Sequence, residues 1–240
     1  MRKFVRPLAF SAALGTAGLA ATHLLGETPP PPAKAAADQP AELKYAVDPR
    51  PLGDTAQKGL KWLAAQQNAD GGFPQGGGWR TGGQGGGRVE NAEDPSDVGN
   101  TCIALLALYR AGNTPTDGEY KEHVRKGLRF LCEKVEKADA KDLYVTDVRN
   151  TQLQSKIGPY VDTFLATLVL SELKGKGGDD EKRLAAALDK TIDKIAKNQK
   201  EDGTFAGNGG WAPVLSQMVC NKGLARAKQN GAAVDDRVFA

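Results

Sequence analysis

The sequence predicts an all-α protein made of three consecutive pairs of helices. A motif with a glutamine, an Asp-Gly turn and an aromatic residue occurs at 67–73 and again 132 residues later (67 to 199), at 199–205. Around the two copies, helical segments with one apolar face alternate with segments that are apolar on every side. A repeat of this length is typical of stacked helical hairpins, and no segment shows the alternation of a β-strand.

The first 35 residues have the features of an export signal followed by the start of a linker. Three basic residues precede an apolar run from Leu8 to Leu25. This order is typical of a secretory signal, although the run is also close to the roughly 20 residues that span a bilayer. We therefore expect an exported protein, periplasmic or extracellular, which this segment either releases or anchors in the membrane. Residues 36–53, rich in Pro, Ala and charge, are expected to be a linker.

The formal net charge of +3 arises in the N-terminal segment. Residues 1–35 hold four basic residues and only Glu27 as an acid, so the remaining chain has 28 basic (32 − 4) and 28 acidic (29 − 1) residues. It contains no block of Lys and Arg interleaved with aromatic residues. The electrostatic pattern of a nucleic-acid-binding domain is therefore absent, and no nucleic-acid partner is expected.

The repeat domain is expected to extend from residue 54 to 240, with repeats at about 54–112, 118–174 and 181–228. Each repeat begins with a helix that has one apolar stripe, marked by Leu60 and Leu63, Leu128 and Leu131, and Ile192 and Ile195. Each continues with a helix that is apolar all round, at 98–109, 161–173 and 214–224. A striped helix keeps one face in water, whereas a wholly apolar helix is buried on all sides. The striped helices should therefore form an outer layer over an inner layer of apolar helices.

The three cysteines lie in these apolar helical patterns. They are Cys102, Cys132 and Cys220, an odd number that allows at most one disulfide within the chain. We interpret them as small core residues, and the sequence alone leaves any pairing open.

The motif resembles that of a known repeat family. The residues that carry the resemblance are Lys58, Gly59, Trp62, Leu63, Gln67, Asp70, Gly71 and Phe73, with Trp79 beyond them, and then Gln199, Asp202, Gly203, Phe205 and Trp211. They resemble the Gln-Trp repeat of squalene and oxidosqualene cyclases and the related repeats of protein prenyltransferase β subunits, and the resemblance covers residues 54–240. It implies an α/α toroid of helical hairpins, in which the glutamine and the aromatic side chains tie each outer helix to a nearby inner helix.

A closed toroid of this family has about twice as many helices as the six that can be recognised here. The resemblance therefore implies an incomplete (α/α)6 barrel. The missing helices would come from self-association with a second copy or from a further half of the toroid.

The catalytic and metal-binding residues of that family are not matched. Its protonating cyclases use an Asp-x-Asp-Asp motif, which this chain lacks. The nearest candidate acids are Asp94, Asp97 and Asp162, each of which can also be interpreted as a helix cap. The prenyltransferases bind zinc with Asp, Cys and His, but Asp-x-Cys is absent and His123 is the sole histidine outside the N-terminal segment. Since zinc needs three or four ligands, we expect no metal and no cofactor.

The leading functional hypothesis is an exported repeat protein that binds an apolar or isoprenoid-like ligand. The expected site is the concave surface of the inner helices, where Phe164 and Met218 are the candidate contacts, because apolar cavities with few polar groups are binding sites. A terpene-cyclase-like isomerase with an Asp as general acid is one alternative. A protein-binding helical scaffold is the other.

Overall fold

The computed structural model describes residues 51–75 and 95–239, and the statements below refer to these residues. The segment Arg50–Ala240 forms one compact unit, separate from Met1–Pro49. The predicted export signal, most of the predicted linker, Trp79 and Asp94 thus lie outside the described residues. Among the described helices, none combines the length and the apolar character that a membrane span requires.

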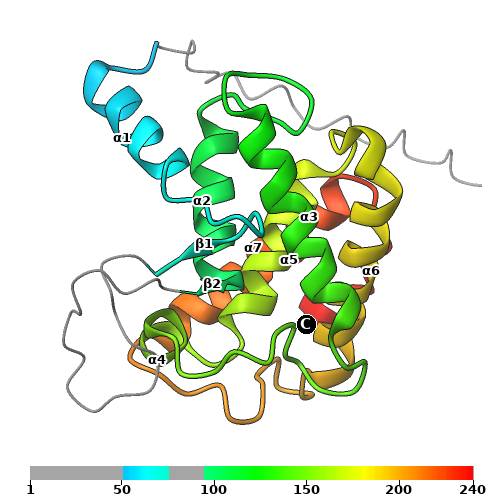
Figure 1. Ribbon diagram of the computed structural model, residues 1–240. Helices are drawn as coiled ribbons and strands as arrows, with labels where there is room; N and C mark the ends of the chain where they lie inside the picture. Colours follow the sequence, from blue (N-terminus) through cyan, green and yellow to red (C-terminus); the bar gives the residue numbers. More distant parts are fainter. Residues whose placement is uncertain (1–50, 76–94, 240) are drawn as a thin grey trace, which may run out of the picture. The chain divides into compact units, whose positions relative to one another are not determined.

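The described chain is all-α, as predicted (Figure 1). The α-helices are α1 (Asp54–Ala64), α2 (Val98–Arg110), α3 (Lys121–Lys137), α4 (Gln152–Ile157), α5 (Val161–Leu173), α6 (Glu181–Asn198) and α7 (Pro213–Gln229). Two 3-10 helices are η1 (Gly178–Asp180) and η2 (Asp236–Phe239). The strands β1 (Phe73–Pro74) and β2 (Ser96–Asp97) form one short antiparallel pair, with Phe73 opposite Asp97.

The helices form two layers, and the predicted alternation of helix types is present in the first two pairs. The helices α2, α5 and α7 form an inner layer, with α5 in the middle in contact with both others. The prediction that the third inner helix is buried on all sides is wrong, because α7 buries only one side, which includes Cys220 and Leu224, and exposes Val214, Leu215 and Met218. The striped helices α3 and α6 pack on each other and on α2 and α5 respectively (Figure 1). Every residue of α5 except Glu172 is buried. A helix covered on all sides must be apolar on all sides, which is why α5 has no stripe.

The helix α4 was not predicted. It has six residues, fewer than two full turns, so it shows no helical period in the sequence. Its start is fixed by a capping box, in which the Thr151 hydroxyl accepts from the Gln154 amide and the Gln154 side chain accepts from the Thr151 amide. This short helix lies beside the N-terminal ends of α5 and α7.

The interpretation of the cysteines as core residues is confirmed. Cys102, Cys132 and Cys220 are all buried, and none forms a disulfide. Burial raises the pKa of Cys132 and of Cys220 to about 12, because it disfavours the charged thiolate.

Candidate functional site

The first copy of the repeat motif joins the end of α1 to the start of α3. The Gln67 side-chain amide donates to the carbonyl oxygens of Gly71, at 2.8 Å, and His123, at 2.9 Å. Its Oε1 lies 2.8 Å from His123 Nδ1. Gly71 has a φ of 87°, and the Gly72 amide donates to Asp70 Oδ1 at 3.0 Å. One amide side chain therefore holds both its own turn and the next outer helix.

The second copy of the motif has the same hydrogen bonds. Gln199 Nε2 donates to the carbonyl oxygens of Gly203, at 3.0 Å, and Val238, at 3.2 Å. Gly203 has a φ of 78°, and the Thr204 amide donates to Asp202 Oδ1 at 2.9 Å. The two stretches are thus one local structure used twice.

The partner of the glutamine differs from the expectation. The resemblance implies a bond from the glutamine to an inner helix, but Gln67 bonds the first turn of the outer helix α3, and Gln199 bonds η2. The turn after α1 runs along α3, since a Cβ added to Gly71 would lie 2.6 Å from the Lys126 carbonyl oxygen. The carbonyls of the next outer element are therefore the nearest acceptors.

The phenylalanines of the motif connect to the inner layer, as expected. Phe73 is buried and its amide donates to Thr101 Oγ1 of α2 at 2.8 Å. Phe205 is also buried, and its ring centroid lies 5.1 Å from that of Phe164 in α5.

The two motif tryptophans within the described residues, Trp62 and Trp211, do not have the expected clasping role. Trp62 is 63% exposed and Trp211 is 83% exposed, so neither indole is in the core. Trp211 carries the Lys156 ammonium 3.7 Å above its ring, a cation–π contact at the surface. The sequence identified the position of both rings but not the direction in which they point.

A row of apolar side chains crosses the three inner helices. Each inner helix has a fully buried hydroxyl near its start: Thr101, Thr163 and Ser216. Two residues after each hydroxyl come Ile103, Leu165 and Met218, which therefore occupy equivalent positions. Ile103 is 45% exposed, Met218 is 54% exposed, and Leu165 between them is 6% exposed. We call the surface made by these three residues and the exposed Leu215 the open face.

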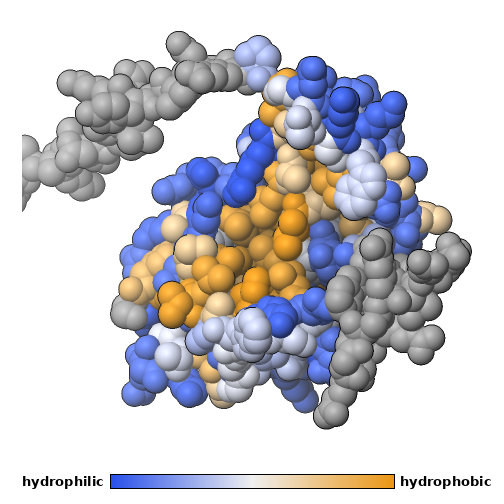
Figure 2. Space-filling model, turned by 90° about the vertical axis from the view of Figure 1, so that its left-hand side faces the viewer, coloured by the Kyte–Doolittle hydropathy of each residue, from blue (hydrophilic) through white to orange (hydrophobic). Residues whose placement is uncertain are grey.

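The open face lies on the side of the inner layer away from α3 and α6. Figure 2 views that side and shows apolar residues gathered in a recessed band. Of the two candidate ligand contacts, Met218 is exposed and is part of the open face. Phe164 is not part of it, because its side chain is fully buried against Phe205.

Two of the three candidate acids lie at the N-terminal ends of α2 and α5. Asp97 is the N-cap of α2 and accepts from the Asn100 amide at 2.7 Å, which confirms its interpretation as a cap. Asp162 is different: the residue at the N-cap of α5 is Tyr160, and Asp162 is buried in the second position of the helix. The helix-cap interpretation of Asp162 is therefore wrong.

The Asp162 carboxyl is held in a nearly closed environment. The Gln154 side chain donates to its Oδ2, while its Oδ1 has no hydrogen bond of normal geometry within the described residues and lies against Gly99. Burial raises the pKa of Asp162 to about 7, and the hydrogen bond from Gln154 opposes this as the second largest effect. Repulsion from Asp97 raises the pKa further, while the Gly99 amide and Arg149 lower it. Asp162 is thus a carboxyl that can hold a proton near neutral pH.

We predict that Asp162 makes the protein less stable as the pH rises from 4 to above 7. The pKa of Asp162 is about 7 in the folded state and about 3.9 in the unfolded state, so between these pH values the folded state binds more protons. The stabilisation that this proton gives the folded state is lost as the pH rises through about 7. Asp162→Asn should remove this component. Urea unfolding of both proteins at pH 4, 5.5 and 7.5 measures it. Parallel pH dependences for the two proteins would contradict the assignment.

Two searches gave no match. No group of three His, Cys, Asp or Glu residues in the described part of the chain is arranged to hold a metal ion. Comparison of the chain with family models, curated proteins and solved structures finds no match. The functional assignment therefore depends on the residues and their geometry.

Proposed function

We propose that this chain is an exported, squalene-cyclase-like α/α toroid module whose open face binds an apolar, isoprenoid-like ligand. The repeat motif with its shared hydrogen bonds supports the toroid architecture, and the apolar run of residues 8–25 supports export. The single observation that carries ligand binding is the row of Ile103, Leu165 and Met218 at equivalent positions of three adjacent inner helices, in which Ile103 and Met218 are exposed and Leu165 lies buried between them. Adjoining exposed apolar side chains mark binding surfaces more often than scattered ones do.

The size of the expected contact favours a weak or moderate affinity for one ligand chain. Covering an exposed Ile or Met side chain gains up to about 1.5–3 kcal/mol each.

Glu172 forms an ion pair with Arg226 at 3.3 Å near the C-terminal end of α5. This pair would bound the apolar row at one end and could contact the polar end of a ligand.

We predict that Ile103→Glu combined with Met218→Glu lowers the affinity for trans,trans-farnesol by at least about tenfold, which corresponds to about 1.4 kcal/mol. The reason is that two carboxylates would replace the apolar contact area of the open face. Titration calorimetry with the full chain measures the affinity. The matched control is Leu52→Glu, because Leu52 is a similarly exposed apolar residue outside this face. An equal loss in the control, or no loss in the double variant, would contradict the proposal.

A second candidate function is a terpene-cyclase-like isomerase in which Asp162 is the general acid. The raised pKa of Asp162 favours it, because a general acid must keep its proton near the working pH. The carboxyl is nearly inaccessible in this structure, so a substrate would require α4 to move aside. Bound lipid in an extract of the purified protein would support either function. Conversion of a polyprene, lost in Asp162→Asn, would select the enzyme. An extract without lipid would favour a protein-binding scaffold.

A further inference from the structure

Each outer helix after α1 buries one side chain against the turn that ends the preceding outer helix. In α3 this side chain is Phe130, and a Cβ added to Gly72 would lie 2.8 Å from its ring. In α6 it is Lys194, which donates to the Asp139 carbonyl oxygen and lies 3.6 Å from Asp142. Aligning 126–131 with 190–195 places Phe130 and Lys194 at the same position. Both junctions between repeats therefore use the same helix position.

Trp62 occupies that position in α1. The stretch 58–63 aligns with 126–131, so Trp62 is the counterpart of Phe130. Phe130 and Lys194 are buried, but Trp62 is largely exposed, since no repeat precedes α1 within the described residues. At the N-terminal edge of the described array, Trp62 therefore has no turn of a preceding repeat to pack against.

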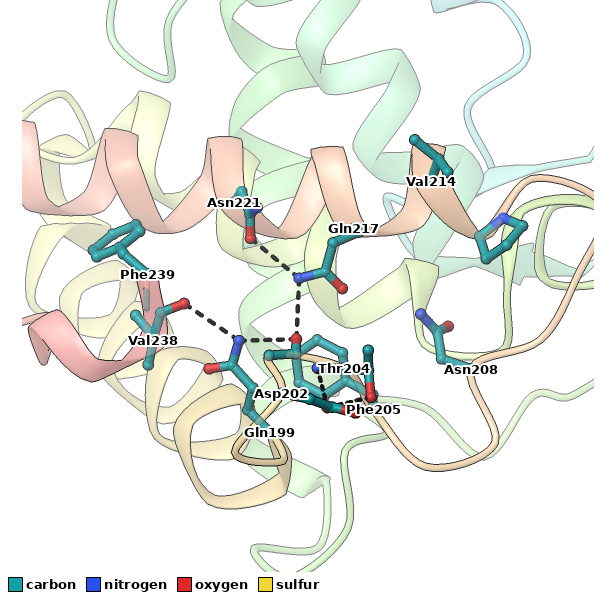
Figure 3. A pocket seen from close by; sticks show the side chains of 12 residues that line it. Gln199, Asp202, Thr204, Phe205, Asn208, Val214, Gln217, Asn221, Val238 and Phe239 are labelled. Atoms are coloured by element: carbon teal, nitrogen blue, oxygen red, sulfur yellow. Dashed lines mark hydrogen bonds between the residues drawn. The ribbon is translucent and has the colours of Figure 1, made fainter.

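The C-terminal edge presents the complementary feature. Gly71 and Gly72 of the first motif are buried, whereas Thr204, the counterpart of Gly72, is exposed. A cavity of about 420 Å³ opens beside this second motif. Figure 3 shows it between the motif residues, Gln217 and Asn221 of α7, and Val238 and Phe239 of η2. Among residues 51–75 and 95–239, no side chain takes at this turn the place that Phe130 takes at the first motif.

We propose that Trp62 of one copy of the chain docks into this cavity of a second copy. The charges at the two edges favour the same pairing: α1 carries Lys58 and Lys61 against Asp54, and the cavity is lined by the Asp202 carboxylate, with Lys200 and Glu201 of the same turn offsetting each other. Opposite charges at the rim favour the correct encounter, and a buried Trp is a frequent anchor of interfaces. Two such contacts related by a two-fold axis close a dimer. The proposal is independent of any ligand on the open face.

One element must adjust for full docking. Gln199 bonds Val238 as Gln67 bonds His123, so η2 stands where the first turn of α3 stands in the preceding repeat. In the docked dimer, α1 of the second copy would lie relative to the second motif as α3 lies relative to the first. The positions of the later turns of this helix are open, so the part of α1 that carries Trp62 fits there. The first turn of α1 would displace η2. The exposed Lys228–Asp236 pair that helps to hold η2 contributes little.

Position-specific cross-linking tests the contact. We mix the full-length variants Trp62→Cys and Val214→Cys, because Val214 lines the cavity and is exposed, and treat them with a short bis-maleimide. The buried native cysteines should react slowly, since burial raises the pKa of their thiols. We expect several-fold more covalent dimer than from Lys182→Cys mixed with Val214→Cys, because Lys182 is exposed near the start of α6 and does not line the cavity.

Two results would overturn the inference. One is an equal yield from the two mixtures. The other is that a chain carrying both Trp62→Cys and Val214→Cys links only within itself. As a second measurement, Trp62→Ala should raise the dimer dissociation constant in sedimentation equilibrium by at least about tenfold, with an unchanged circular dichroism spectrum as the control for folding. An unchanged constant would count against Trp62 as the anchor.

Discussion

Replacing Phe164 with alanine is expected to lower the free energy of unfolding by about 3–5 kcal/mol, the usual cost of removing a buried aromatic side chain. The Phe164 side chain is fully buried in the middle helix of the inner layer, where its ring packs on that of Phe205. The variant would lose both the buried apolar area and this ring contact, which adds about 0.5–1.5 kcal/mol in such pairs. Urea unfolding followed by circular dichroism measures the change.

Met218→Ala is the matched control for Phe164→Ala. Both residues were candidate ligand contacts, but Met218 lies on the open face with about half of its surface in water. Its truncation should change stability by less than about 1 kcal/mol, since exposed substitutions have small effects. A loss in Met218→Ala as large as that in Phe164→Ala would show that Met218 is a core residue and would remove it from the open face.

Gly71→Ala is expected to destabilise the protein by about 2–5 kcal/mol. The left-handed backbone at Gly71 costs a residue with a Cβ about 1–2 kcal/mol. The new Cβ would also lie 2.6 Å from the Lys126 carbonyl oxygen, so the turn or α3 must shift, and such overpacking adds about 1–3 kcal/mol. The same shift would strain the bonds from Gln67 to Gly71 and His123. Thermal and urea unfolding measure the loss.

Gly112 allows the two causes to be separated. Its φ of 89° matches that of Gly71, but a Cβ added there meets no atom within 4 Å. Gly112→Ala should therefore show only the backbone cost of about 1–2 kcal/mol. Equal losses in the two variants would mean that the turn after α1 is not packed against α3.

Much of the fold could be predicted from local patterns. The six longer helices, the two layers and the Asp-Gly turns follow from apolar periodicity and from glycine, both of which act over a few residues. The short helix α4 was missed because six residues carry no readable period. Trp62 was recognised as a motif residue, but its exposed fraction depends on packing against segments distant in the sequence, which no local pattern describes.

The candidate site was predicted less completely, because α5 is apolar on every side. Periodicity cannot tell that Phe164 packs against Phe205 when all neighbouring positions of the helix are apolar. The same limit applies to Asp162, whose short-range pattern resembled a cap. Its burial against Gly99 and Gln154 arises from segments that precede it in the sequence and pack over it in the fold.

By itself, the sequence determined the helical class, the alternation of striped and apolar helices, and the repeated turn, since each depends on interactions between residues close along the chain. Tertiary packing alone decided that Gln67 bonds the next outer helix, that Asp162 holds a proton near neutral pH, and that Trp62 is exposed among the described residues while Phe130 is buried. These properties depend on which distant segments exclude water from a side chain, and burial of that kind is a property of the assembled layers.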